Sequence, residues 1–312
     1  MKHAPILVTG APRSGTTFLG KMLALPRHVL YVDEPFNSQT GIEGVRTFFP
    51  HPLEWQEGGT EPYADVVRQL FSGEAQFKPS ELRASTKNPL RQLARELWVS
   101  RENLNYKLQT HSPLKRRFLI KDPMACYLSE YLYRQFSMKT VVIMRHPLST
   151  IASYKRLGWH YDVAGLLVRS GVAGAELGQA LRSVELATMS DIEAWSLLWL
   201  HIYTALREFM KRNPSMIFIT HEELSLRPQH ILARLYDLLE LPFTLRVSER
   251  ITAHTNAENP IDPTDNQPHV LHRNSAENVN RWKKILTDDE MAKIRHITGP
   301  FVSQYYPESS WD

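Results

Sequence analysis

Residues 6–19, which read ILVTGAPRSGTTFL, join a short apolar run to a glycine-containing turn and the start of a predicted helix. A strand, a turn and a helix in this order point several backbone N–H groups and a helix N-terminus at one anion. The spacing is that of a Walker A phosphate loop, except that Thr16 stands where such loops carry a lysine. Because that lysine reaches the β- and γ-phosphates of a nucleoside triphosphate, its absence argues against an ATPase or GTPase.

Outward from this stretch, short apolar runs alternate with amphipathic ones, a pattern that predicts βαβ units and a parallel sheet. The expected strands are Ile6–Thr9, Val29–Val32, Phe118–Lys121, Thr140–Met144 and Met216–Thr220. The expected helices are Gly15–Leu25, Tyr63–Phe71, Leu90–Trp98, Tyr127–Gln135, Pro147–Arg156, Asp191–Lys211, Pro228–Leu239 and Asp288–Ile297. We therefore expect a single α/β domain over residues 1–312, with a P-loop-type central parallel sheet flanked by helices.

Two segments interrupt the alternation. Residues 36–116 are rich in proline, glycine and charge, and residues 158–190 are rich in glycine and alanine with helical character. Long insertions in a compact fold are usually lids or binding loops, although a tolerated surface insertion has the same composition. We expect both segments to form helical insertions on the substrate side of the sheet.

Composition excludes several classes of protein. The 312 residues carry 37 Lys and Arg against 33 Asp and Glu, without a block of five like charges, so a nucleic-acid-binding arm is not expected. The lone Cys126 excludes an internal disulfide and a thiolate zinc site. No apolar run approaches 18 residues, and Arg13 interrupts the first apolar run before a signal peptide is complete. A cytoplasmic protein without a membrane span is expected.

The run from Thr9 to Leu19, with PRSGTT at its centre, resembles the 5′-phosphosulfate-binding loop of the sulfotransferases, which use 3′-phosphoadenosine 5′-phosphosulfate (PAPS) as donor. A second segment supports the resemblance. Residues 141–147 read VVIMRHP, and Ser153 follows Arg145 by eight residues across a predicted strand–helix junction. In the family such a pair holds the 3′-phosphate, and an arginine fork suits bidentate phosphate binding.

Two later segments resemble the family more loosely. After the strand ending at Thr220, His221 stands where the family has a tyrosine that contacts the nucleotide. Residues 271–273 and 281–283, which read LHR and RWK, resemble the late loop that closes over PAPS, and this makes Arg273 an expected phosphate ligand. The neighbouring residues of that loop are not preserved.

The resemblance implies a set of PAPS-binding residues: Pro12, Arg13, Ser14, Gly15, Thr16, Thr17, Arg145, Ser153, His221 and Arg273. Arg13 would contact the sulfate and the bridging oxygen, and the two threonines would donate to the 5′-phosphate. Ser14 would bind the 3′-phosphate or restrain Lys121. No metal is required, because side-chain cations can neutralise the leaving phosphate.

Glu34 is the expected general base. It follows the second predicted strand in YVDEP, at the edge where an open parallel sheet binds ligands, and it resembles the catalytic glutamate of tyrosylprotein and heparan-type sulfotransferases. Asp33 is the alternative base, and a solvated loop carboxylate is the alternative role for Glu34. The cytosolic enzymes instead use a histidine two residues after a strand-end lysine, and here Pro123 occupies that place.

Lys121 is retained at this strand end. It is expected to stabilise charge on the transferred group or to orient the acceptor, although a surface lysine paired with Asp122 has the same sequence. Together Glu34, Lys121 and Arg13 form the expected catalytic set.

These features together predict sulfuryl transfer from PAPS to a hydroxyl by in-line displacement, with release of adenosine 3′,5′-bisphosphate (PAP). A saccharide, lipid-linked glycan, phenol or peptide tyrosine can present the hydroxyl, and the resemblance of the base favours a carbohydrate or glycoconjugate. The alternatives are a P-loop kinase or other phosphotransferase, and a PAPS-binding module without turnover. The sequence specifies no oligomeric state.

Overall fold

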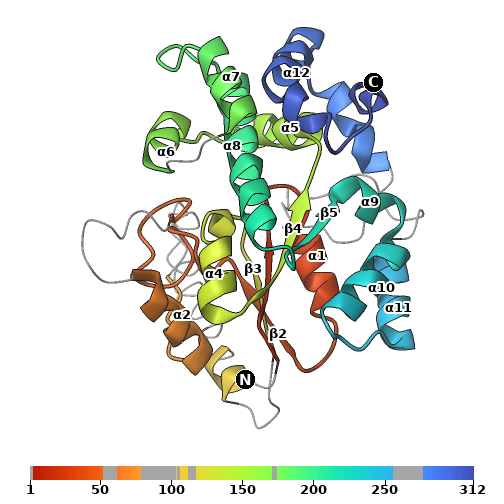
Figure 1. The fold of residues 1–312 in the computed structure, drawn as a ribbon. Helices are drawn as coiled ribbons and strands as arrows, with labels where there is room; N and C mark the ends of the chain where they lie inside the picture. Colours follow the sequence, from red (N-terminus) through yellow and green to blue (C-terminus); the bar gives the residue numbers. More distant parts are fainter. Residues whose placement is uncertain are drawn as a thin grey trace, which may run out of the picture.

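The computed structural model describes residues 3–51, 62–78, 103, 106–111, 117–170, 174–255 and 277–312. A five-stranded parallel sheet in the order β2-β3-β1-β4-β5 lies at its centre (Figure 1). The strands are β1 (Ile6–Thr9), β2 (Val29–Asp33), β3 (Arg117–Lys121), β4 (Lys139–Met144) and β5 (Ile217–Thr220). The predicted α/β class is confirmed, and each predicted strand forms with its ends shifted by at most one residue.

β1 is the central strand and is entirely buried. Ile6 is in register with Leu119 of β3 on one side and with Lys139 of β4 on the other. Strands covered on both faces carry continuous apolar runs, which explains why the predicted strands do not alternate. Because the chain moves to opposite sides of β1, the carboxyl ends of β1, β3 and β4 open a crevice of the kind that binds ligands in α/β sheets.

Helices cover both faces of the sheet (Figure 1). On one face, apolar residues of α1 (Thr16–Leu23), α10 (Pro228–Leu238) and α11 (Leu245–Thr255) share a core with the strands. On the other face, α2 (Pro62–Ser72) and α4 (Ser129–Phe136) do the same. The helix expected over Leu90–Trp98 lies outside the described residues.

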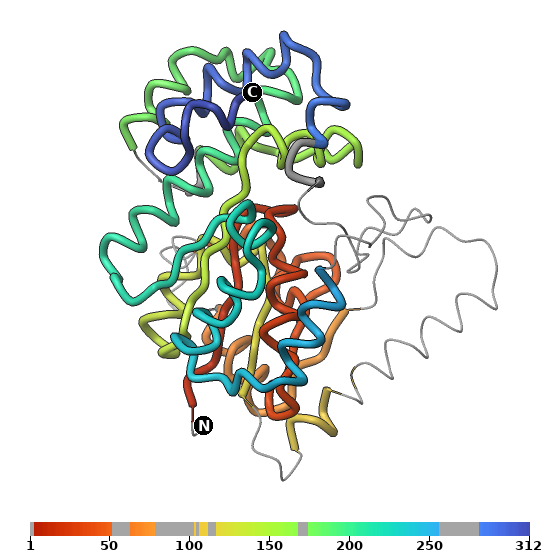
Figure 2. The backbone as a smooth tube through the Cα atoms, turned by 90° about the vertical axis from the view of Figure 1, so that its right-hand side faces the viewer, coloured from red at the N-terminus to blue at the C-terminus, as the bar shows by residue number. Residues whose placement is uncertain are grey.

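A further layer of helices lies beyond the carboxyl ends of the strands (Figure 2). It contains α5 (Pro147–Leu157), α6 (Val163–Ser170), α7 (Ala175–Ser183), α8 (Asp191–Arg212) and α12 (Asp288–Val302). The expected helical character of residues 158–190 is confirmed by α6 and α7. α8 also extends alongside the sheet, because its buried residues share a core with Val142 and Met144 of β4.

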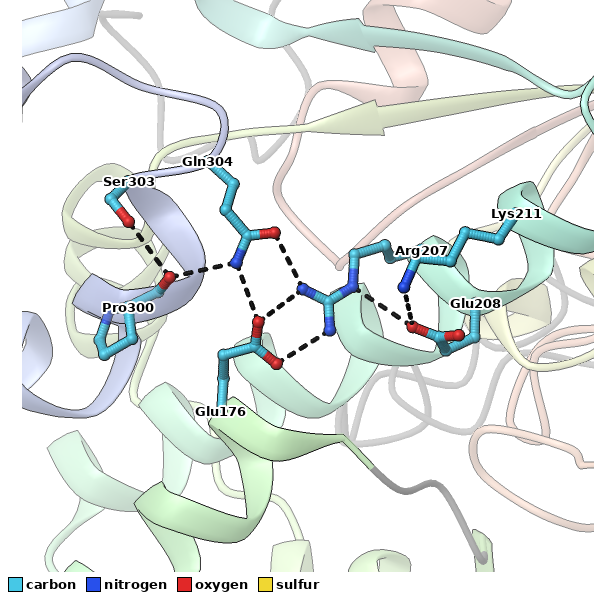
Figure 3. A network of polar contacts seen from close by, with 7 residues as sticks. All are labelled: Glu176, Arg207, Glu208, Lys211, Pro300, Ser303 and Gln304. Atoms are coloured by element: carbon cyan, nitrogen blue, oxygen red, sulfur yellow. Dashed lines mark hydrogen bonds and ion pairs between the residues drawn. The ribbon is translucent and has the colours of Figure 1, made fainter.

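A polar network joins three of these helices (Figure 3). Arg207 of α8 makes a bidentate ion pair with Glu176 of α7, with N–O distances of 2.8 and 2.9 Å. Gln304, just after α12, donates to the same carboxylate at 2.9 Å and accepts from Arg207 at 3.1 Å. Planar arginine–carboxylate pairs fix orientation as well as distance, so this network constrains how α7, α8 and the end of α12 are oriented.

Short elements complete the described chain: the 3₁₀ segments η3 (Met124–Cys126), η4 (Glu277–Lys284) and η5 (Glu308–Trp311), and the helix α9 (His221–Leu226). Among the described helices, none has both the length and the apolar character needed to cross a membrane.

Candidate active site

A cavity of about 700 Å³ lies at the carboxyl ends of the strands. The predicted site residues that line it are Pro12, Arg13, Gly15, Thr16, Thr17, Glu34, Arg145, Ser153 and His221. Ser14 and Lys121 are buried, and neither is among the residues that line the cavity. Arg273 lies outside the described residues. The structure thus brings together residues that the sequence spreads over more than two hundred positions.

The phosphate loop connects β1 to α1 through unusual backbone angles. Gly10 has φ 154°, Arg13 φ 68° and Gly15 φ 100°. A Cβ atom at Gly10 would lie 2.1 Å from the carbonyl oxygen of Ile143, so only glycine fits there. Gly15 precedes the first residue of α1, and no side chain caps this helix end. The first N–H groups of α1 are therefore available to an anion in the cavity.

Two buried tyrosines hold the loop in place. The hydroxyl of Tyr203 donates to the carbonyl of Ile143 at 3.0 Å and accepts from the N–H of Ala11 at 3.2 Å. The hydroxyl of Tyr154 donates to the carbonyl of Pro12 at 2.8 Å. The loop conformation is thus fixed by α5, α8 and β4 before any ligand binds, which lowers the cost of ordering it around one.

The two segments that resemble phosphate-binding motifs are in direct contact. Nε of Arg13 donates to Oγ of Ser153 at 3.1 Å, and Nη1 of Arg145 donates to the carbonyl of Arg13 at 3.3 Å. The Arg13 guanidinium also lies over the ring of Trp159, 5.8 Å from its centroid. Two arginines therefore converge on one part of the cavity, and a ligand carrying two anionic groups suits this concentration of positive charge.

At the ends of β2 and β3, Lys121 makes two ion pairs. Its Nζ lies 2.6 Å from Oε1 of Glu34 and 2.6 Å from Oδ1 of Asp33, and its side chain is only 1% exposed. Burial lowers the pKa of Lys121, but the charges of the two carboxylates outweigh burial, and the net shift is upward. The alternative of a surface lysine paired with Asp122 is wrong, because Lys121 is buried and its ion pairs are with Glu34 and Asp33.

Glu34 lines the cavity, and Asp33 is the more exposed carboxylate, at 59% against 25% for Glu34. The N–H of Glu34 donates to the carbonyl of Lys121 at 2.8 Å, which continues the strand pairing for one residue beyond β2. Its second carboxylate oxygen accepts from Nδ2 of Asn37 at 2.9 Å. The Glu34 carboxylate is thus held at the cavity wall, with Oε1 on the ammonium group of Lys121 and Oε2 on the side-chain amide of Asn37.

His221 begins α9, directly after β5. A Thr220–Glu223 capping box starts this helix, with the hydroxyl of Thr220 accepting the N–H of Glu223 at 3.1 Å. The His221 ring packs against the phosphate loop so closely that a Cβ at Gly15 would lie 2.6 Å from its Nδ1. The residue at the family's tyrosine position therefore borders the loop.

A model of the sulfotransferase family matches residues 5–245. The chain belongs to the sulfotransferase family. The predicted family and the predicted PAPS-dependent enzyme class are thereby confirmed, and neither a phosphotransferase nor an inactive binding module is favoured.

Solved structures of sulfotransferases resemble the fold at low identity. The sulfotransferase domain from the curacin biosynthetic pathway is 16% identical, with 96% of this chain and 98% of that chain covered and a TM-score of 0.48. STF9 from Mycobacterium avium is 16% identical, with 98% and 78% covered and a TM-score of 0.46. Mouse SULT7A1, complexed with PAP, is 12% identical, with 98% and 87% covered and a TM-score of 0.43. No curated protein matches the chain.

In this sulfotransferase, both insertions contribute aromatic rings to the cavity wall. Phe48 comes from the first insertion, and Trp159 and Tyr161 from the second. The ring centroids of Phe48 and Tyr161 are 5.6 Å apart, and those of Trp159 and Tyr161 are 6.1 Å apart. Polar side chains of Asn37 and Gln39 line the same cavity. An apolar wall with a few polar groups is typical of small-molecule sites.

The sequence did not predict the residues whose side chains hold the phosphate loop and Glu34 of this sulfotransferase in place. Tyr203 and Tyr154 lie on predicted helices, but nothing local marks their hydroxyls as loop anchors. Their partners are 192 and 142 residues away along the chain. Asn37 carries a weak local signal, since it follows Glu34 by three residues in a proline-containing turn.

Proposed function

We propose that this sulfotransferase transfers the sulfuryl group of PAPS to a hydroxyl of a carbohydrate or glycoconjugate, with Glu34 as general base. The observation that carries the proposal is that Glu34 lines the same cavity as the phosphate loop while its carboxylate contacts the buried Lys121 at 2.6 Å. A base, a cation and an anion-binding loop are the groups that sulfuryl transfer needs.

The donor would lie along the phosphate loop. The backbone N–H groups of Arg13 and of residues 15–17, together with the hydroxyls of Thr16 and Thr17, would bind the 5′-phosphosulfate. Arg145 and Ser153 would bind the 3′-phosphate. Nε of Arg13 donates a hydrogen bond to Oγ of Ser153 at 3.1 Å, so its guanidinium lies between the phosphate loop and the proposed 3′-phosphate site. It would contact the sulfate or the bridging oxygen when the donor binds. The phosphate loop and the two arginines, Arg13 and Arg145, suit PAPS because this donor carries two separate anionic groups.

In the chemical step, the acceptor oxygen attacks sulfur while the bond from sulfur to the bridging oxygen breaks. The proton of the acceptor hydroxyl passes to the Glu34 carboxylate, and the bridging oxygen leaves on PAP. Lys121 and Arg13 would stabilise the negative charge that spreads over the transferred group and the leaving phosphate. By analogy with phosphoryl transfer, positioning and electrostatic stabilisation supply most of the acceleration.

The acceptor would bind against the aromatic wall. Trp159 and Tyr161 offer flat apolar surfaces, and Asn37, Gln39 and Thr40 offer hydrogen-bonding groups at the same cavity. A sugar ring has apolar C–H faces and a rim of hydroxyls, so it uses both kinds of surface. This combination supports a saccharide acceptor over a purely apolar one.

Glu34→Gln tests the base assignment. We expect single-turnover transfer to fall by about 100-fold or more, while calorimetry shows PAP affinity within about 2-fold of wild type. Asp33→Asn is the matched variant, because it removes the other carboxylate on Lys121, and we expect a smaller effect. Retained turnover in Glu34→Gln would remove Glu34 from this role. An acceptor screen, in which mass spectrometry detects the gain of one SO₃ group, tests the acceptor class separately.

A further inference from the structure

Asp122 is a fully buried carboxylate that the reaction proposed above does not use. It follows Lys121 at the end of β3. Its N–H donates to the carbonyl of Val8 at 3.0 Å, and its carbonyl accepts from Oγ1 of Thr9 at 2.8 Å. The backbone of Asp122 is therefore fixed to β1, the strand that leads into the phosphate loop.

The Asp122 carboxylate joins two loops. Oδ2 accepts the N–H of Phe36 at 2.6 Å, and Oδ1 accepts the N–H of Met124 at 2.8 Å. The first amide follows β2 and the second begins η3, so one side chain connects the segments after two neighbouring strands. A buried carboxylate is costly unless hydrogen bonds satisfy it, and here both oxygens are satisfied by backbone amides rather than by the adjacent lysine.

These bonds act on the chain directly beside Glu34. Glu34 has φ 46°, a left-handed conformation that is strained for a non-glycine residue. Its own N–H is held by the carbonyl of Lys121 at 2.8 Å, and two residues later the N–H of Phe36 is held by Asp122. The backbone is thus fixed on both sides of the strained residue, which keeps the Glu34 carboxylate at the cavity.

The second bond acts on another segment of the cavity wall. Pro123 and Met124 line the cavity together with Glu34 and Asn37. Burial, followed by the nearby charge of Glu34, raises the pKa of Asp122, whereas the two amides and Lys121 oppose that rise. The two amides and Lys121 favour the ionised form, but burial and the charge of Glu34 outweigh them, and the net shift of the Asp122 pKa is upward.

We propose that Asp122 is a positioning residue for sulfuryl transfer, whose two amide hydrogen bonds set the placement of Glu34 relative to Lys121 and the acceptor. The inference rests on the proposed role of Glu34 as base. Asp122 acts through Glu34 and not through the donor site.

A double-mutant cycle in the full chain tests this inference. Asp122→Asn keeps the shape but turns an N–H₂ group toward one of the two amides. We expect the single-turnover rate to fall about 10-fold or more in the wild-type background and less than about 2-fold when Glu34→Gln is already present. PAP affinity should stay within about 2-fold in both backgrounds. A residue that only stabilises the fold would lower the rate equally in both.

The controls separate positioning from stability. Thr298→Ala removes another buried hydrogen bond, from Oγ1 to the carbonyl of Ile294 at 2.7 Å in α12, and should lower the melting temperature without changing the rate per folded molecule. If Asp122→Asn does not fold, Asp122→Ser, which keeps one short acceptor and removes the carboxyl group, enters the same cycle.

Each result has one meaning. A loss that is confined to the background containing Glu34 supports the positioning role. A loss of equal size in both backgrounds, or a loss of PAP affinity, overturns it and leaves Glu34 as the base. Retained turnover in Glu34→Gln alone overturns both the base assignment and the inference that depends on it.

Discussion

Lys121 and Glu34 meet at the ends of adjacent strands, with the lysine Nζ 2.6 Å from the glutamate Oε1 and the lysine side chain almost completely buried. A buried cation that is paired with two carboxylates is held in one place. We expect Lys121→Met, which keeps the length of the side chain, to lower kcat by about 100-fold while PAP affinity changes by less than about 3-fold. Transfer assays and calorimetry measure the two quantities, and an equal loss in both would place Lys121 in the donor site.

Arg145 is expected to act on donor affinity. It contacts the carbonyl of Arg13 and lies two residues before α5, which carries Ser153. We expect Arg145→Ala to weaken PAP binding by about 10- to 100-fold, and Arg145→Lys to give an intermediate loss because a lysine keeps the charge but not the planar fork. Adenosine 5′-monophosphate is the control ligand. Since it lacks the 3′-phosphate, its affinity should be the same in all three proteins.

The phosphate loop should not tolerate a side chain at Gly15. The residue has φ 100°, and a Cβ there would lie 2.6 Å from Nδ1 of His221. We expect Gly15→Ala to lower PAP affinity by about 10-fold or more and to destabilise the fold by about 1–3 kcal/mol. Gly299→Ala is the matched control, because its Cβ would meet only Cγ of Arg295 at 3.8 Å inside a helix. That variant should be neutral or more stable by up to about 1 kcal/mol.

The ion pair of Glu176 with Arg207 should appear in the acid stability of the protein. Hydrogen bonds from Arg207 hold the pKa of Glu176 at about 2, against its usual 4.5. A carboxyl whose pKa is lowered by folding stabilises the protein above the unfolded value and loses that contribution as pH falls through the folded value. Urea unfolding between pH 5 and about 2 should therefore show a stability loss of about 1–3 kcal/mol that Glu176→Gln lacks. Parallel curves for the two proteins would contradict this prediction.

The aromatic wall is predicted to bind the acceptor and not the donor. Trp159→Ala should raise the acceptor KM by about 10-fold with a smaller change in kcat, because it removes apolar contact that is present before and during the reaction. Trp282, also at the cavity but on η4, provides a comparison at a different part of the wall. A rise in the KM for PAPS alone would show that Trp159 belongs to the donor site.

Local patterns in the sequence were sufficient for the strands and the phosphate loop. The glycine-containing turn predicted after the first strand is confirmed, and Gly10 and Gly15 both have positive φ angles there. α9 carried a readable signal as well, since Thr220 and Glu223 have the spacing of a capping box, although no helix was predicted there. α11, which is largely polar with few apolar positions, gave no comparable signal.

Distant contacts could not be predicted, because they depend on strand order. The sequence placed Lys121 and Glu34 at the ends of two strands but left open whether those strands are neighbours. In the sheet β2 lies beside β3, with Asp33 in register with Lys121, and this pairing brings both carboxylates to the buried lysine. The same holds for Ser153, whose contact with Arg13 spans 140 residues.

The predicted donor ligands and the aromatic wall come from different kinds of structure. Except for Ser153, which lies within α5, the predicted donor ligands that the structure describes lie in the loops and helix starts directly after the strands. The rings of Phe48, Trp159 and Tyr161 belong to the insertions. Under the proposed function, substitutions in the insertions would therefore change which acceptor is modified without disturbing the residues proposed to bind the donor. Acceptor specificity could then diverge among relatives while donor binding is kept, and exchanging these insertions between relatives is a direct way to change the acceptor.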